Sequence, residues 1–238
     1  MIIDVLAFSP HPDDAEMGCG GLLLKLKDKG YRTGIIDLTE AELSTSGDIK
    51  TRKKETEEAA EILGLDIREN LKLEDCNINN DFESRLKVIN IIRKYKPKLV
   101  VIPYSKDRHP DHESSCKLLK DAIFISGLEK FKTKQKSYRP DIVINYMLSY
   151  QFEPSFIVDI SKYYKTKVEA VTAYKSQFYS DKEKKIVTHI ALNWYFDVIN
   201  SRGKFYGLKI KSEHGEPFFI ESDIKIEDPL DFFKYLFY

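Results

Sequence analysis

Two short clusters of histidine and aspartate are the residues of this 238-residue chain that could do chemistry together. Residues 11–14 read His-Pro-Asp-Asp, and residues 109–112 read His-Pro-Asp-His. Imidazole and carboxylate groups are the usual ligands of zinc and of non-haem ferrous iron. Two histidines with one carboxylate leave a coordination position open, which is typical of a catalytic metal site. The remaining groups of the two clusters are then available for proton transfer and for orienting the ligands.

The spacing inside each cluster supports a shared site. His11 and Asp14 are three residues apart at a predicted helix start, which places them on one face, and His109 and His112 repeat this interval. A single histidine or aspartate at such a position is more often a helix cap or a packed residue. Two copies of the pattern favour a metal site, although the spacing alone leaves the cap interpretation open.

The elements that must position these clusters alternate regularly in the first half of the chain. Hydrophobic patterns predict buried strands at residues 2–8, 33–38, 68–71 and 98–103. They predict amphipathic helices at residues 20–29, 50–63, 82–95 and 113–126. This order implies an α/β fold, a Rossmann-like doubly wound sheet that is mainly parallel, with helices on both faces. In the common strand order 3-2-1-4, both clusters would meet at the crevice where such sheets bind ligands.

The second half of the chain is less regular. Strands are predicted at residues 142–147 and 156–159, and helices at 161–174 and 186–201, whereas elements after residue 205 cannot be separated. Repeats and linker-like stretches are absent from the sequence. We therefore expect one domain over residues 1–238, in which 1–128 form the Rossmann-like half and 129–238 complete it.

Composition excludes several classes of protein. The 38 Lys and Arg residues balance 38 Asp and Glu residues, which argues against a nucleic-acid partner. Hydrophobic residues make up 42% of the chain, enough for a core and too many for a disordered protein. No stretch approaches the ~18 apolar residues of a membrane span. The first residues lack a signal-peptide pattern, and three cysteines without pair spacing indicate reduced thiols, so we expect a cytoplasmic protein.

The clusters resemble those of the LmbE-like (PIG-L-type) zinc-dependent N-deacetylases, which remove acetyl groups from N-acetylglucosamine units. Residues 37–47, Arg52, the pair Asp107-Arg108 and residues 169–178 look like the bacillithiol-biosynthesis branch of that family. The resemblance covers nearly the whole chain. It implies a Zn²⁺ cofactor, with Fe²⁺ possible in the same site, a small-molecule N-acetylated sugar as substrate, and a homo-oligomer.

Residue roles carry over from the resemblance position by position. The metal ligands match His11, Asp14 and His112. The catalytic residues match the general base Asp13 and a histidine held by a carboxylate, His109 with Asp111. The substrate-binding residues match Arg52, Arg139 and Tyr195. The chain departs from the family at Ala41 and Ser46, where glycine and arginine are common, so substrate contacts from this loop are open.

Amide hydrolysis follows from these roles. Zinc would acidify its water, Asp13 would accept the proton, and a protonated His109 would stabilise the oxyanion. The bacillithiol branch implies N-acetylglucosaminyl malate as substrate, with malate carboxylates bound by Arg52 and Arg139. The alternatives are another N-acetylated sugar, such as a chitin fragment or lipid-linked glucosamine, a metal–sugar binding protein without turnover, or a non-haem iron protein that activates oxygen.

Four other features are given simpler interpretations. Residues 18–21, Gly-Cys-Gly-Gly, lack the dinucleotide-binding spacing and are expected to serve close helix–sheet packing. The five cations of residues 130–139 predict a solvated loop, with a lid over an anionic substrate as the alternative. His189 and His214 fit no ligand spacing and are expected to be surface or packing residues. The aromatic tail 232–238 is either packing or an interface.

Overall fold

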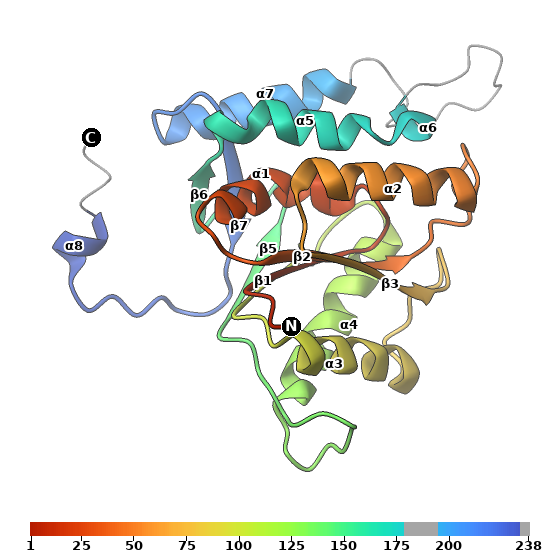
Figure 1. Ribbon diagram of the computed structural model, residues 1–238. Coiled ribbons are helices and arrows are strands. Elements are labelled where there is room, and N and C mark those ends of the chain that lie inside the picture. Colours follow the sequence, from red (N-terminus) through yellow and green to blue (C-terminus); the bar gives the residue numbers. More distant parts are fainter. Residues whose placement is uncertain (179–194, 234–238) are drawn as a thin grey trace.

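One seven-stranded sheet forms the centre of the computed structural model, which describes residues 1–178 and 195–233 (Figure 1). The strand order is β3-β2-β1-β4-β5-β7-β6. The strands are β1 (Val5–Ser9), β2 (Thr33–Thr39), β3 (Ile67–Leu73), β4 (Leu99–Pro103), β5 (Ile142–Tyr146), β6 (Phe156–Asp159) and β7 (Gly215–Phe219). β1 to β5 pair in parallel, whereas β7 is antiparallel to β5 and to β6. The predicted Rossmann-like sheet and its 3-2-1-4 order are confirmed.

Helices cover both faces of this sheet (Figure 1). One side of the sheet carries α1 (Asp14–Asp28) and α2 (Ile49–Leu63). Beyond them, in an outer row, lie α5 (Tyr164–Thr172), α6 (Lys175–Phe178) and α7 (Tyr195–Lys209), with the 3₁₀ turn η1 (Ser161–Tyr163) before α5. The other face carries α3 (Phe82–Tyr95) and α4 (Pro110–Ser126), and α8 (Pro229–Phe233) lies apart from both layers. Among the described helices, none is both long and apolar enough to cross a membrane.

Alternation along β1 divides the core between these two helical layers. Leu6 and Phe8 pack into the apolar cluster that includes residues of α3 and α4. Val5 and Ala7 point the other way, into the cluster that includes residues of α1. Successive side chains of a strand face opposite sides of the sheet, so an uninterrupted apolar run is what a strand covered on both faces requires. This rigid strand ends directly before the first histidine–aspartate cluster.

α1 begins at Asp14 rather than at the predicted residue 20, and it is kinked at Cys19, whose φ is −144°. The carboxylate of Glu216 accepts hydrogen bonds from Gly21 N–H (2.8 Å) and Leu22 N–H (2.7 Å), so it satisfies two amides just beyond the kink. A Cβ atom on Gly18 would lie 2.1 Å from the Tyr146 ring. The glycines therefore serve close packing, as predicted.

The second half of the chain differs more from prediction. The helix predicted at residues 161–174 is instead η1 followed by α5, which ends at Thr172, and α7 extends to Lys209 rather than to residue 201. The part of the predicted helix before residue 195 lies outside the described residues, as does His189. Strand β7 was not predicted, because Gly215 and Pro217 are unfavourable in strands. His214 is a packing residue, buried and stacked on Tyr164 with ring centroids 3.6 Å apart.

Candidate metal-dependent active site

The two clusters meet beyond the carboxyl ends of β1 and β4, which are adjacent parallel strands. The ring centroids of His11 and His112 lie 5.6 Å apart, and His109 lies 4.8 Å from the first and 4.9 Å from the second. One potential ligand nitrogen from each of the three rings falls within 4.8 Å of the others. Residues that are distant in sequence therefore form one cluster, as the strand order predicted.

Asp14 lies between the two histidines predicted to be its fellow ligands. Its Oδ2 atom is 3.1 Å from His11 Nδ1 and 3.3 Å from His112 Nε2. Ligand bonds of 2.0–2.2 Å at tetrahedral angles place the ligand atoms of a zinc site about 3.3 Å apart. The donor types and these two separations suit a divalent cation of the zinc or ferrous class. Among the described residues, the groups whose ligand atoms all lie within 4.8 Å of one another are His11 with His109 and His112, and His11 with Asp75 and Asp111.

The charges of this group reinforce one another. Burial raises the pKa of Asp14, but the neighbouring His112 and His11 outweigh it and hold that pKa well below its usual range. Burial lowers the pKa of His112, yet Asp14 and Asp107 raise it to about 9. A cation would replace the protons that now balance the Asp14 carboxylate, because metal ligands bind in their deprotonated forms.

Asp107 orients His112 and was missed as a site residue by sequence reasoning. Its Oδ1 lies 2.9 Å from His112 Nδ1, and its Oδ2 accepts a hydrogen bond from Ser149 N–H over 2.8 Å. A carboxylate on the far ring nitrogen fixes the orientation of a ligating histidine. Its position in the same loop, two residues before His109, is the signal that could have identified it.

Asp13 is buried and strained. It occupies the N-cap position of α1 with φ 123°, a conformation that non-glycine residues rarely adopt and that clusters at functional sites. Its side chain makes no capping hydrogen bond, so the simple cap interpretation does not apply to it. Burial raises the pKa of Asp13 to about 7 despite the opposing charge of Arg52. A carboxyl group that titrates near neutral pH is suited to general base catalysis.

Arg52 contacts Asp13 directly. Its Nη1 donates to Asp13 Oδ2 (2.9 Å) and to the Pro12 carbonyl oxygen (2.8 Å), and its Nη2 donates to Ser44 Oγ (2.8 Å). The side chain is only 6% exposed. It lines the site pocket, yet most of its donors already bind the protein.

The predicted contact between the Asp111 carboxylate and His109 is wrong. The carboxylate lies 3.2 Å from His11 Nε2 and accepts from Cys76 N–H over 2.8 Å. His109 is the N-cap of α4, and its Nδ1 accepts the backbone N–H of Asp111 over 3.2 Å. Side chains two residues apart on a helix do not face each other, which explains the difference. Burial and the charges of His11 and His112 lower the pKa of His109, contrary to the expected imidazolium.

Asp75 is a second carboxylate on His11 that sequence reasoning missed. Its Oδ1 lies 3.2 Å from His11 Nε2, and its Oδ2 accepts a hydrogen bond from Leu43 N–H over 2.9 Å. Burial raises the pKa of Asp75, but these two partners outweigh it and lower the pKa to about 2. Asp75 follows β3 and is far from both clusters in sequence, and no sequence pattern around it predicts its contact with His11.

A pocket of about 380 Å³ opens over this cluster, within the usual range for small-molecule sites. Two cationic side chains that were not predicted as binding residues, Arg108 and Arg202, lie in its lining. The other lining residues come from both clusters, from α1 and α2, from the loop before α2, from residues 75–76 and 148–150, and from α7. The pocket therefore combines the proposed metal ligands, a carboxyl group with a pKa near 7, and three arginines, of which Arg52 is already bound to Asp13.

The predictions for Arg139 and Tyr195 fare differently. Arg139 is wrong as a pocket residue of this chain, because its Nη2 donates to Phe124 O (2.8 Å) at the carboxyl end of α4. α4 has 17 residues and begins at the site, so its far end is about 25 Å away. Tyr195 is the first residue of α7, and its side chain lies outside the described parts of the structure.

The lysine-rich residues 130–139 lie at the same remote end, so the interpretation of this segment as a lid is wrong. Arg93 of α3 anchors the segment by donating to the carbonyl oxygens of Phe131 and Leu128 and to Thr133 Oγ1, each within 2.9 Å. All three cysteines are free, in agreement with the expected reduced thiols.

Comparisons with known proteins match the fold and the part of the sequence that holds both clusters. The family model described as PIG-L, GlcNAc-PI de-N-acetylase, matches residues 6–123, which include both clusters. Diacetylchitobiose deacetylase of Thermococcus kodakarensis is 31% identical over 189 residues, covering 74% of this chain and 71% of that protein.

Solved structures extend the match to nearly the whole chain. A conserved protein of Thermus thermophilus superposes with a TM-score of 0.87 at 34% identity, covering 96% of this chain and 98% of that one. N,N'-diacetylchitobiose deacetylase of Pyrococcus horikoshii, in complex with an inhibitor, superposes with a TM-score of 0.80 at 29% identity, covering 91% and 83%.

Proposed function

Because the chain belongs to the PIG-L de-N-acetylase family, we propose that it is a metal-dependent hydrolase that removes the acetyl group from an N-acetylglucosamine derivative. The observation that carries this proposal is the position of Asp14, within 3.3 Å of ring nitrogens of His11 and His112, next to the buried Asp13. A ligand set with an adjacent non-ligand carboxylate is what hydrolysis needs, whereas a binding protein would need no base.

His11, Asp14 and His112 would hold the cation. When bound, a divalent cation acidifies water and polarises the acetamide carbonyl, which makes amide hydrolysis accessible at neutral pH. Zn²⁺ is our first assignment, and Fe²⁺ shares these ligands. Asp107 fixes the His112 ring from behind, so the donor nitrogen is already oriented before the cation arrives.

Asp13 is the proposed general base. Its burial favours the protonated form, and Arg52 opposes this, so the carboxyl group can accept a proton from water and later release it. The proton then passes from Asp13 to the departing amine. His109, the alternative donor, would have to be protonated first, which its lowered pKa opposes. We assign Asp13 first, because its pKa of about 7 suits both directions of transfer.

His109 is the proposed oxyanion donor in its neutral form. Its Nδ1 accepts the Asp111 N–H, so the ring proton resides on Nε2, and the residue lines the pocket. A neutral imidazole N–H aimed at the developing oxyanion is a recognised form of transition-state stabilisation. Asp111 acts through His11 rather than through His109 in this proposal.

N-acetylglucosaminyl malate is the proposed substrate, giving glucosaminyl malate and acetate. Its malate part carries two carboxylates, and Arg108 and Arg202 in the pocket lining supply guanidinium groups of the complementary charge. N,N'-diacetylchitobiose is the second candidate, because two relatives are deacetylases of that sugar. It is uncharged, so it would form no ion pair with these arginines.

An acetate-release assay on both substrates, with elemental analysis of the purified protein, tests the proposal. We expect about one equivalent of zinc or iron per chain, loss of activity with a chelator, and recovery on adding back Zn²⁺ or, without oxygen, Fe²⁺. Arg108→Ala should lower kcat/KM for the malate glycoside by about 10-fold or more and leave N,N'-diacetylchitobiose unaffected. Equal losses on both substrates would contradict the carboxylate contact. Full activity after metal removal would contradict the proposed chemistry.

A further inference from the structure

Asp75 connects a predicted metal ligand to the loop that lines the pocket. Its buried carboxylate lies 3.2 Å from His11 Nε2 through Oδ1 and accepts from Leu43 N–H through Oδ2 (2.9 Å). Its own backbone N–H donates to Glu42 Oε1 over 2.8 Å. Asp75 therefore makes two hydrogen bonds with the loop, at Leu43 and Glu42, and a third contact with the His11 ring.

We propose that Asp75 is a positioning residue that holds the His11 imidazole for the cation and couples cation binding to the order of residues 40–47. The inference rests on the proposed role of His11 as a ligand. His11 Nδ1 faces Asp14, so it is the nitrogen that would bind the cation, and it can do so only when the ring proton is on Nε2. A carboxylate next to Nε2 stabilises that tautomer, and Asp75 is one of the two carboxylates in this position.

Asp111 Oδ2 is the hydrogen-bond partner of His11 Nε2 (3.2 Å), and Asp75 Oδ1 pairs with the same nitrogen as an ionic partner at 3.2 Å. Asp111 does not connect the ring to the loop. Its carboxylate is held by Cys76 N–H (2.8 Å), from the residue that follows Asp75. Residues 75–76 therefore contribute one carboxylate to His11 and restrain the other. Only Asp75 of these two carboxylates also binds the loop backbone at Leu43.

The contacts close into a ring around the proposed base. From Asp75 they run to Leu43, and the next residue, Ser44, accepts from Arg52, which in turn donates to Asp13. Asp13 and His11 are two residues apart and complete the ring. A displacement of His11 is thereby transmitted to the pocket loop, and a disordered loop leaves the His11 ring held by fewer partners.

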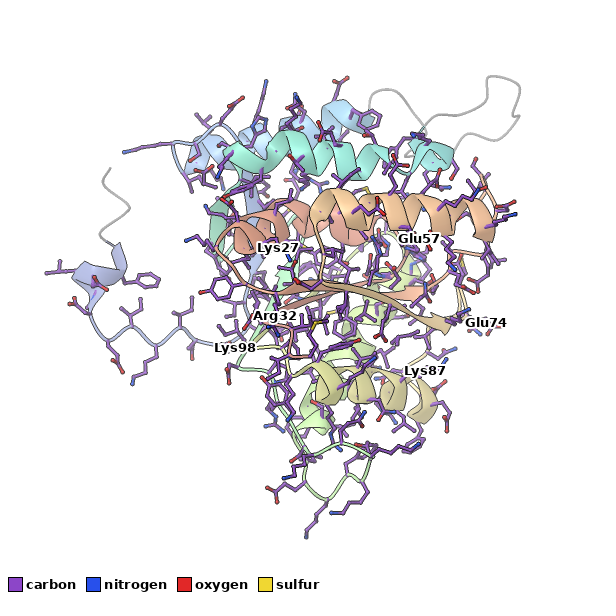
Figure 2. The ribbon with its side chains drawn as sticks, in the orientation of Figure 1. Lys27, Arg32, Glu57, Glu74, Lys87 and Lys98 are labelled. Atoms are coloured by element: carbon purple, nitrogen blue, oxygen red, sulfur yellow. The ribbon has the colours of Figure 1, made fainter. Side chains whose placement is uncertain are left out.

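Zinc affinity of Asp75→Asn, measured by competition with a chromophoric chelator, tests the inference. We expect the apparent Kd for Zn²⁺ to rise by about 10–100-fold, as is typical when such a supporting carboxylate is lost. Glu74→Gln is the matched control, since it removes the same charge from the neighbouring exposed position beyond β3 (Figure 2). The control should bind Zn²⁺ like the wild type.

The absorption spectrum of bound Co²⁺ reports the geometry of its ligands, which the loss of a nearby charge alone would not change. Co²⁺-loaded Asp75→Asn should show shifted d–d absorption bands, and Glu74→Gln should not. Glu42→Ala, an exposed change that keeps the Asp75 side chain, should weaken Zn²⁺ binding in the same direction and by less, so it keeps the test valid if Asp75→Asn fails to fold.

The outcomes separate this inference from the proposed function. If the wild-type protein binds neither Zn²⁺ nor Co²⁺, the proposed metal site itself fails. If the wild-type protein binds both ions and Asp75→Asn retains wild-type affinity and spectrum, the positioning role is overturned while the proposed function stands. If Asp75→Asn does not fold, wild-type affinity of Glu42→Ala overturns the coupling to the loop.

Discussion

Arg52 donates one hydrogen bond to Asp13 Oδ2 over 2.9 Å, and both side chains are almost completely buried. The resemblance to known deacetylases assigned this arginine to the substrate. In the structure the same guanidinium group binds the proposed base, the Pro12 carbonyl oxygen and the Ser44 hydroxyl group. Its first role is therefore to keep Asp13 ionised and fixed, and any contact with substrate is additional.

Replacing Arg52 should thus affect catalysis through Asp13. Arg52 lowers the pKa of Asp13, so Arg52→Gln should raise that pKa above its present value of about 7. The base works deprotonated, and the acid limb of the kcat/KM profile should move to higher pH. The profile is measured by acetate release between pH 5 and pH 9, with Arg32→Gln, an exposed change, as control. A lower rate with an unshifted limb would contradict the role in ionisation.

Asp13→Asn and His112→Ala should both lose deacetylase activity, but for different reasons. Asp13→Asn should keep its metal and lose about 10²–10⁴-fold in kcat, the usual contribution of a general base. His112→Ala removes one of the nitrogens that face Asp14, and it should lose metal affinity itself. Elemental analysis after dialysis, combined with kinetics at saturating Zn²⁺, distinguishes the two. Emptying of the site by Asp13→Asn but not by His112→Ala would reverse the ligand assignment.

Arg139→Ala should leave kcat/KM unchanged on every substrate, because the side chain binds the carboxyl end of α4 rather than the pocket of its own chain. The guanidinium group lies 4.7 Å from the Phe124 ring centroid, an exposed cation–π contact worth about 0.5–1 kcal/mol. The free energy of unfolding should fall by about that amount in urea titrations. A specific loss of activity on the malate glycoside would show that Arg139 acts in a pocket after all, for example that of a second copy.

The site residues could be predicted from the sequence where short local patterns determine their positions. The apolar runs of β1 and β4 predicted adjacent buried strands, and this adjacency alone brings His11 and His112 together. Asp75 could not be found in this way, because it reaches His11 only through tertiary folding of the segment after β3. The prediction for Arg139 failed because a matched residue type does not show which groups fold around it, and Arg139, which follows α4 in the chain, binds the Phe124 carbonyl oxygen at the end of that helix.

Breaking the buried ion-pair network around Arg68 should destabilise the protein more than removing an exposed cation does. Arg68 binds both oxygens of Asp37 (2.8 and 2.9 Å) and the buried Glu16 (2.6 Å), and Tyr174 donates to Glu16 over 2.7 Å. Arg68→Leu leaves two carboxylates without their cation, which typically costs about 3–5 kcal/mol. Urea unfolding measures this loss. The exposed Arg32→Leu should cost less than about 1 kcal/mol, and equal losses would show that the network contributes little.

Asp66, which lies away from the site, should make the free energy of unfolding depend on pH. Its carboxylate binds Lys27 Nζ (2.8 Å) and accepts from Thr33 N–H (2.9 Å), and although partial burial raises its pKa, these partners outweigh that effect and lower it. A lowered pKa in the folded protein means that the stabilisation is complete above the unfolded pKa of about 3.9 and is lost as pH falls through the folded value.

The free energy of unfolding of the wild type should therefore exceed that of Asp66→Asn by about 1 kcal/mol between pH 5 and pH 7, and this difference should shrink below about pH 4. Urea unfolding of both proteins across this range measures the difference at each pH. Asp223→Asn, in the exposed segment after β7, is the control and should show no comparable gap. A difference that stayed constant down to pH 3 would mean that Asp66 contributes through its shape rather than through its charge.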